Sequence, residues 1–105
     1  MTLTQARIPV SLGRILITSA AEEALARPDI DAALGRHVRG DWGDLCLDDC
    51  RQNELALREG ERLCSAYTDR RATRFYIITK ADRSATMVLL PEDYCARELT
   101  APRSA

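Results

Sequence analysis

Residues 62–90, which read RLCSAYTDRRATRFYIITKADRSATMVLL, decide the fold. This stretch contains runs rich in β-branched, aromatic and aliphatic residues, separated by short polar connections, and such a pattern is typical of β-strands. The runs are Arg62–Tyr67, Arg74–Lys80 and Ser84–Leu90. Because connections of this length are too short for a parallel crossover, the stretch predicts an antiparallel meander.

Upstream of the meander, the sequence predicts one more strand and a first helix. Residues 13–18 read GRILIT, a short aliphatic run that indicates a strand. Directly after it, Ser19-Ala20-Ala21-Glu22 matches a capping box, in which the Ser and Glu side chains bind free backbone N–H groups at the start of a helix. We therefore expect a helix over residues 20–26.

Two further helices are expected between this helix and the meander. Pro28 is expected to end the first helix, and Asp29 to cap a second one whose apolar residues recur at helical spacing as far as Val38. A third helix is expected to begin near Asp48, where an acidic side chain suits the positive end of the helix dipole, and to stop before Gly60. The helices thus separate the first predicted strand from the other strands.

These elements predict an α+β fold of the order β-α-α-α-β-β-β. It should have two layers, with the helices packed on a mainly antiparallel sheet of three or four strands. A chain of 105 residues has the length of one domain and can bury a modest core. We place that single domain at residues 11–95 and expect residues 1–10 and 96–105 to be flexible termini.

The composition is that of an ordinary soluble globular domain, with 46% hydrophobic and 30% charged residues. A net charge of −1 does not support a general nucleic-acid binder, although a local basic patch would still allow a nucleic-acid partner. Residues 41–54 are acidic and residues 58–74 are mildly basic, which is ordinary for solvated faces. Since the sequence shows no signal peptide and no apolar run of roughly 18–20 residues, we expect a cytoplasmic protein with no membrane role.

The four cysteines do not form a recognisable metal site. Cys46 and Cys50 stand four residues apart, whereas zinc sites usually use the tighter C-x-x-C pair together with a second pair of Cys or His. Cys64 and Cys95 are isolated from them in the sequence. In a reducing compartment we expect buried thiols, so the sequence predicts no metal and no cofactor.

His37 is the only residue whose ordinary pKa lies near neutral pH. It falls on the apolar stripe of the second predicted helix, which predicts a half-buried residue at the helix end that bonds a backbone carbonyl. The alternative is that His37 faces a cleft beside Asp41 and Asp44 and acts as an acid, a base or a ligand. The sequence leaves both interpretations open.

Asp41, Trp42 and Asn53 are candidate binding residues. Trp42, which stands between Asp41 and Gly43, is expected to anchor a helix corner against the core, the alternative being a recognition aromatic on the surface. Asn53 is a polar residue on a helix stripe otherwise made of Cys and Leu, and burying an amide without partners costs roughly 1–3 kcal/mol. We expect it to clamp the backbone of Gly40–Gly43, or else to contact a ligand.

The connection between the last two predicted strands is the most specific candidate binding site. Its candidate binding residues are Asp82 and Arg83. Asp and Ser are natural turn residues, but a plain turn has no use for an Arg followed by hydroxyls at alternate strand positions. Arg83 with Ser84 and Thr86 could bind an anion such as phosphate or carboxylate. We expect these residues to line the best surface depression, near Trp42 or His37.

Four segments carry a resemblance to a known family. They read His37-x-x-Gly40-Asp41-Trp42-Gly43, Asp49-x-x-x-Asn53, Leu63-Cys64-Ser65-Ala66-Tyr67 and Ile77-Ile78-Thr79-x-Ala81-Asp82-Arg83-Ser84-x-Thr86-x-x-Leu89-Leu90-Pro91-x-x-Tyr94. The chain there resembles a family of small uncharacterised proteins carried on plasmids, integrative elements and phages. They are often called plasmid-related proteins and sometimes, loosely, type I restriction methyltransferase subunits. The resemblance implies an accessory role in a mobile element, whereas the chain is too short for the usual doubly wound methyltransferase domain.

Two functions remain open from the sequence. The first is a non-enzymatic mobile-element accessory protein that binds a host or element macromolecule, in counter-defence or in element maintenance, with a protein as the expected partner. It rests on the small size, the resemblance and the absence of common catalytic motifs. The second is a small metal-independent ribonuclease with a layout similar to barnase, colicin and RelE-type nucleases. There His37 would be the general acid or base, Arg83 would hold the phosphate, and Ser84 or Thr86 would position it, all on one open cleft.

Overall fold

The computed structural model describes residues 10–93 of the chain. Its elements are β1 (Arg14–Ile17), α1 (Ser19–Ala24), α2 (Arg27–Val38), α3 (Leu47–Glu59), β2 (Leu63–Thr68), β3 (Arg74–Thr79) and β4 (Ala85–Leu89). This order confirms the predicted succession of one strand, three helices and three strands. The flexible termini predicted at residues 1–10 and 96–105 lie outside the described residues, except for Val10.

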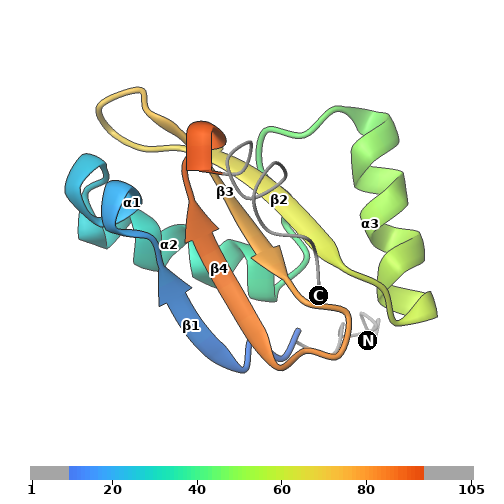
Figure 1. Cartoon of the computed structure of the whole chain (residues 1–105). Helices are drawn as coiled ribbons and strands as arrows, with labels where there is room; N and C mark the ends of the chain where they lie inside the picture. Colours follow the sequence, from blue (N-terminus) through green and yellow to red (C-terminus); the bar gives the residue numbers. More distant parts are fainter. Residues whose placement is uncertain (1–9, 94–105) are drawn as a thin grey trace, which may run out of the picture.

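The strands form one mixed sheet in the order β1-β4-β3-β2. β2, β3 and β4 pair antiparallel, as their short connections predicted, with Ser65 opposite Ile77 and Ile77 opposite Val88. β1 pairs with β4 in parallel, with Ile17 opposite Val88, after the chain has passed through the helices and most of the meander. β1 and β2 are therefore the two edges of the sheet (Figure 1).

One face of the sheet is covered by α1 and α2 (Figure 1). Side chains alternate along a strand, so every second strand residue points to this face and packs against the apolar side of α2. The buried residues of this core are Ala21, Leu25, Ile30, Ala33, Leu34, Tyr67, Phe75, Ile77, Val88 and Leu90. The packing confirms the prediction of helices layered on a mainly antiparallel sheet.

α3 lies alongside β2 at the edge of the sheet, away from α1 (Figure 1). A second, smaller cluster of buried residues joins it to the body of the protein, and this cluster consists of Val10, Trp42, Ala56 and Leu63. Gly60 ends α3 in the left-handed conformation, with a φ of 73°, and the chain then turns back into β2. The third helix therefore flanks an edge strand, whereas α1 and α2 cover a face.

Two helix starts differ from the prediction. α1 is capped by Thr18 rather than Ser19, because Thr18 Oγ1 accepts a hydrogen bond from the N–H of Ala21 at 3.1 Å. Pro28 does not end a helix. It lies in the first turn of α2, where the N–H that proline lacks would have no partner within the helix. Asp29 accordingly lies inside that first turn and does not cap it.

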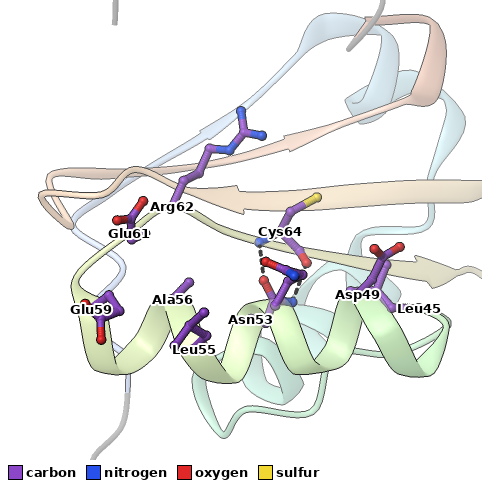
Figure 2. A pocket seen from close by; sticks show the side chains of 10 residues that line it. Leu45, Asp49, Asn53, Leu55, Ala56, Glu59, Glu61, Arg62 and Cys64 are labelled. Atoms are coloured by element: carbon purple, nitrogen blue, oxygen red, sulfur yellow. Dashed lines mark hydrogen bonds between the residues drawn. The ribbon is translucent and has the colours of Figure 1, made fainter.

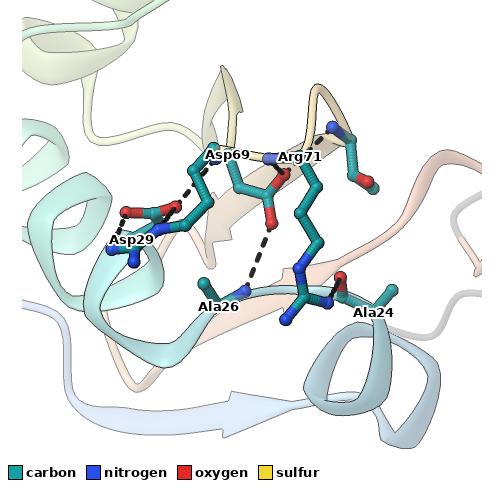
Figure 3. A network of polar contacts seen from close by, with 7 residues as sticks. Ala24, Ala26, Asp29, Asp69 and Arg71 are labelled. Atoms are coloured by element: carbon teal, nitrogen blue, oxygen red, sulfur yellow. Dashed lines mark hydrogen bonds and ion pairs between the residues drawn. The ribbon is translucent and has the colours of Figure 1, made fainter.

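The connection between β2 and β3 is fastened to the start of α2 (Figure 3). Asp69 is 6% exposed and accepts a hydrogen bond from Ala26 N at 3.2 Å as well as from N–H groups of its own loop. Beside it, Nε and Nη2 of Arg70 donate to the two carboxylate oxygens of Asp29, each at 3.0 Å. These bonds hold the pKa of Asp29 below its usual value. The loop is thus locked to the helix layer.

Candidate functional site

His37 is fully buried, and both of its ring nitrogens meet hydroxyl groups. Nδ1 lies 2.5 Å from Ser65 Oγ on β2, and Nε2 lies 2.8 Å from Thr79 Oγ1 on β3. Thr79 Oγ1 lies 2.8 Å from Thr86 Oγ1 on β4, and Thr86 donates to the carbonyl of Leu12 at 2.8 Å. This buried polar chain (Ser65, His37, Thr79 and Thr86) crosses the sheet from β2 toward the segment before β1.

The direction of each hydrogen bond in the buried polar chain follows from its last acceptor. A carbonyl can only accept, so Thr86 gives its single proton to Leu12 and must accept from Thr79. Thr79 then has no proton left for His37, so His37 donates from Nε2. In the neutral ring, Nδ1 accepts from Ser65. Burial and, to a lesser degree, the charge of Arg83 lower the pKa of His37 to about 4, which keeps the ring neutral near neutral pH.

The expectation of a half-buried His37 bonded to a backbone carbonyl is therefore wrong. Its partners are side-chain hydroxyls, and it has no exposed surface. An imidazole in this position cannot reach a phosphate in solution, so the open cleft that the ribonuclease alternative requires is not present around it. The apolar stripe of the helix signalled burial, but the partners Ser65 and Thr79 come from strands that only the tertiary fold brings to the helix.

Arg83, Ser84 and Thr86 do not line the surface groove between α3 and β2, contrary to the prediction that they line the best depression. The Arg83 backbone has a left-handed φ of 63°, and its Nη1 donates to the carbonyls of Glu61 at 2.7 Å and Lys80 at 3.1 Å. The guanidinium therefore closes the β3–β4 turn and ties it to the start of β2. Thr86 is buried in the polar chain, while Ser84 is exposed on the turn.

Asp82 has the role of an ordinary turn residue. Its Oδ1 accepts a hydrogen bond from Ser84 N at 3.0 Å. Hydrogen bonds from Ser84 hold the pKa of Asp82 below the usual value, and the bond from the Ser84 side chain has a larger effect than the one from its backbone. The tight turn predicted at this connection is confirmed, with Asp82 and Arg83 both engaged in closing it.

Trp42 is the anchor that the sequence predicted. It is 4% exposed, donates from Nε1 to Glu54 at 2.9 Å, and meets the His37 ring edge-on with the ring centroids 5.6 Å apart. Asp41 is exposed and binds the Arg36 guanidinium through both carboxylate oxygens, at 2.8 and 3.2 Å. Both residues therefore shape the loop before α3 through contacts within the chain.

Asn53 clamps β2 rather than the backbone of Gly40–Gly43, so that prediction is wrong. Its Nδ2 donates to the Cys64 carbonyl at 2.6 Å, and its Oδ1 accepts from Cys64 N at 3.1 Å. One donor and one acceptor meet the strand, as they would if a neighbouring strand lay there. The reason for the difference is that α3 lies along β2 and turns this side of the helix toward the strand.

Ala66 is the next residue of β2 whose backbone N–H and C=O groups point away from β3, and both groups form hydrogen bonds with the loop before α3. Ala66 N donates to the Trp42 carbonyl at 3.3 Å, and the Ala66 carbonyl accepts from Asp44 N at 2.7 Å. This approach requires Gly43, whose φ is 74°, because a Cβ there would collide with the Ala66 carbonyl. Since Cys64 and Ala66 both have their outward backbone groups bonded within the chain, we call β2 the sealed edge.

A groove of about 580 Å³ runs between α3 and β2, with the Asn53–Cys64 contact at its floor (Figure 2). It is lined by Leu45, Asp49, Gln52, Asn53, Leu55, Ala56, Glu59, Glu61, Arg62 and Cys64. Three of these side chains are acidic, and the basic one, Arg62, extends away from the helix. Leu55 is 44% exposed there. This surface, the α3 groove, combines negative charge with an accessible apolar side chain.

Of the predicted binding residues, Asn53 alone lines the α3 groove. The sequence indicated an acidic region over residues 41–54, which includes Asp49. It did not indicate that Glu59 and Glu61 join Asp49 on one surface. Those two residues flank Gly60, and they reach the groove only because the chain reverses there to run along the helix.

Within residues 10–93, no group of three or more His, Cys, Asp or Glu side chains is placed to hold a metal ion. Cys46 is exposed, and Cys50 and Cys64 are half-buried, so the expectation of buried thiols is wrong for Cys46. Burial raises the pKa of the Cys50 and Cys64 thiols, which keeps them protonated near neutral pH. Cys95 lies outside the described residues.

None of the helices in the described part of the chain combines the length and the apolar content needed to cross a membrane. No model of a known protein family matches the chain, and neither a curated protein nor a solved structure matches it.

Proposed function

We propose that this protein is a non-enzymatic accessory protein that acts by binding a protein partner in the α3 groove. The observation that carries the proposal is the lining of that groove, which combines three acidic side chains with an exposed Leu55. A partner segment with basic side chains around an apolar anchor is complementary to this surface. Apolar anchors supply most of the affinity at such sites, and charge pairs at the rim supply specificity and a fast association rate.

A nucleic-acid partner is less compatible with the same surface. Asp49, Glu59 and Glu61 would repel the phosphates that dominate nucleic-acid binding. The arginines of the β2–β3 connection are already engaged, because Arg70 pairs with Asp29 and Arg71 donates to a carbonyl of α1. These charges favour a protein partner over RNA or DNA.

The ribonuclease alternative has little support from the positions of its expected residues. His37 is fully buried, and the Arg83 guanidinium donates to backbone carbonyls. Cleavage of RNA by the purified protein would therefore contradict the proposed function.

The biological setting is part of the proposal and rests on the family resemblance of the sequence. In that setting the partner is a protein of the host or of a mobile element, and binding takes place in the cytoplasm. Its effect is to blunt a host defence system or to support maintenance of the element.

Site-specific cross-linking tests the groove directly. A photoreactive amino acid at Gln52, an exposed position that lines the groove, captures the partner in an extract of the native host, and the captured protein is then purified. Leu55→Arg is expected to raise the dissociation constant of that purified complex by about tenfold or more. Leu47→Arg is the matched control, because Leu47 is 65% exposed on the same helix and does not line the groove.

Two results would contradict the proposed function. One is an equal loss of affinity in the Leu55→Arg and Leu47→Arg proteins, which would place the binding surface elsewhere. The other is capture of RNA that the purified wild-type protein cleaves, which would support the ribonuclease instead.

A further inference from the structure

β1, the second edge of the sheet, has one side open. β4 is the only strand that pairs with it in the described residues. Arg14 N donates to the carbonyl of Ser84, just before β4, and Thr18 N donates to the carbonyl of Val88 in β4. In a parallel ladder every second residue faces the same neighbour. Ile15 and Ile17 therefore point their N–H and C=O groups away from the sheet.

The side chains of this edge are apolar and accessible. Ile15 is 46% exposed and Leu16 is 41% exposed, on opposite faces of the sheet. Edge strands are usually protected against pairing by charges, prolines, bulges or a covering segment. Apart from Arg14 at its start, β1 has none of these protections within residues 10–93, so it is a template for the addition of another strand.

We propose that β1 pairs antiparallel with the β1 strand of a second copy of this chain, across a twofold axis at Leu16. In this register, Ile15 of one copy lies opposite Ile17 of the other, and the two residues exchange their outward backbone hydrogen bonds. Leu16 then meets Leu16 of the second copy at the closer, non-hydrogen-bonded position. The pairing goes beyond the proposed function and does not depend on it.

Charge complementarity favours a second copy as the occupant. In the same register, Arg14 of one copy lies opposite Thr18 of the other, so no arginine faces an arginine. Thr18 Oγ1 donates to Asp93 Oδ2 at 2.6 Å, which places a carboxylate beside that position. Each end of the paired strands thus brings the Arg14 of one copy toward the Asp93 of the other. A twofold pair uses this self-complementary surface twice, whereas an unrelated peptide would use it once.

The pairing has a consequence for the α3 groove. That groove lies against β2, and the strand order places β2 at the opposite edge from β1 (Figure 1). A pair joined through β1 therefore leaves the groove free on both copies. Such a pair displays two grooves, and a repetitive or dimeric partner would bind it with avidity.

A charge exchange at Leu16 tests the proposal. Leu16→Lys and Leu16→Glu each place like charges directly opposite one another in the pair, so each variant alone is expected to weaken dimerisation by about tenfold or more in sedimentation equilibrium. In an equimolar mixture of the two variants, a heterodimer places the introduced Lys of one chain opposite the introduced Glu of the other. Mixing is therefore expected to restore association. Leu47→Lys, on α3, is the control at another exposed leucine and is expected to leave dimerisation unchanged.

Circular dichroism verifies that each variant is folded. Ile15→Pro provides a second test, because the N–H that it removes points away from the sheet and bonds no strand within residues 10–93. The proposal is overturned if the wild-type protein stays monomeric up to about 1 mM, a concentration that would detect even weak pairing. It is also overturned if folded Leu16→Lys and Leu16→Glu proteins do not associate when mixed, or if Leu47→Lys is the variant that abolishes dimerisation.

Discussion

β2 and β1 form the two edges of one sheet, and their outward-facing backbone groups have different surroundings. On β2, the side chain of Asn53 and the loop before α3 bond the outward groups of Cys64 and Ala66, so no further strand can add there. On β1, the outward groups of Ile15 and Ile17 meet no strand in the described part of the chain. Within residues 10–93, the fold thus protects the edge beside the α3 groove and leaves the far edge without a second neighbouring strand.

The buried polar chain connects the two edges and gives the largest expected effect. It begins at Ser65 on the sealed edge, passes through His37 and ends at Leu12, shortly before β1. A change in the protonation of His37 therefore alters its hydrogen bonds with Ser65 on β2 and Thr79 on β3.

Acidification from pH 6.5 to pH 4 is expected to lower the free energy of unfolding by roughly 3 kcal/mol through His37 alone. The pKa of His37 is lowered to about 4 in the folded protein by burial, whereas the unfolded chain titrates near the ordinary value of 6.5. Between these values the unfolded state binds more protons, so stability is fully present above pH 6.5 and is lost as the pH falls. Urea unfolding at several pH values measures how the free energy of unfolding changes with pH.

His37→Gln is the control for this effect, because it removes the titrating group. The carboxylates contribute equally to both proteins, so the difference between the two slopes isolates His37. Identical slopes in the wild-type and His37→Gln proteins would contradict the assignment of a neutral, buried imidazole.

Asn53→Ala is expected to lower the free energy of unfolding by about 1–3 kcal/mol, because it leaves the Cys64 N–H and C=O without their partner on the sealed edge. Gln52→Ala is the matched control, since it removes an exposed amide from the neighbouring helix position and should change stability by no more than about 0.5 kcal/mol. Equal effects of the two substitutions would show that the Asn53 clamp does not stabilise the fold.

Arg83 offers a paired test at the turn that is tied to the start of β2. Arg83→Ala is expected to cost roughly 1–2 kcal/mol, because the carbonyls of Glu61 and Lys80 lose a charged donor. Arg83→Gly loses the same bonds but adopts the φ of 63° without strain, so it should be more stable than Arg83→Ala by about 1 kcal/mol. Thermal unfolding of both variants checks the order, and a more stable Ala variant would contradict it.

Leu16→Lys is expected to have the smallest effect on the stability of a single copy, within about 0.5 kcal/mol. Leu16 is 41% exposed on the open edge, so its side chain contributes little to the core. Denaturant unfolding of dilute protein measures this. A loss above about 1 kcal/mol in the monomer would mean that Leu16 serves the fold rather than association.

The fold could be predicted largely from the sequence, because most of its strands and helices are determined by residues close together in the sequence. The alternating apolar pattern of residues 62–90 and their short connections dictate the antiparallel meander. The parallel partner of β1 could not be assigned in this way. Its pairing with β4 joins residues such as Ile17 and Val88, which are distant in sequence. A strand of four residues is also too short for its sequence pattern to indicate which strand it pairs with.

The candidate site was predicted less well, because its contacts cross between elements. Asn53 was recognised as a buried amide in need of partners, yet the partner depends on how α3 is oriented beside β2. Arg83 and the hydroxyls beside it in the sequence suggested an anion site, but the guanidinium donates hydrogen bonds to the backbone carbonyls of Glu61 and Lys80 instead. Side-chain type therefore indicated which residues needed partners, and only the tertiary fold determined which partners they found.

Residue-resolved hydrogen exchange compares the two edges most directly. In a dilute sample of the wild-type protein, we expect the amides of Cys64 and Ala66 to exchange slowly and those of Ile15 and Ile17 to exchange rapidly. Raising the protein concentration should slow exchange at Ile15 and Ile17 and leave Cys64 and Ala66 unchanged. Slow exchange of Ile15 and Ile17 in dilute monomer, or rapid exchange of Cys64 and Ala66, would contradict the assignment of one sealed and one open edge.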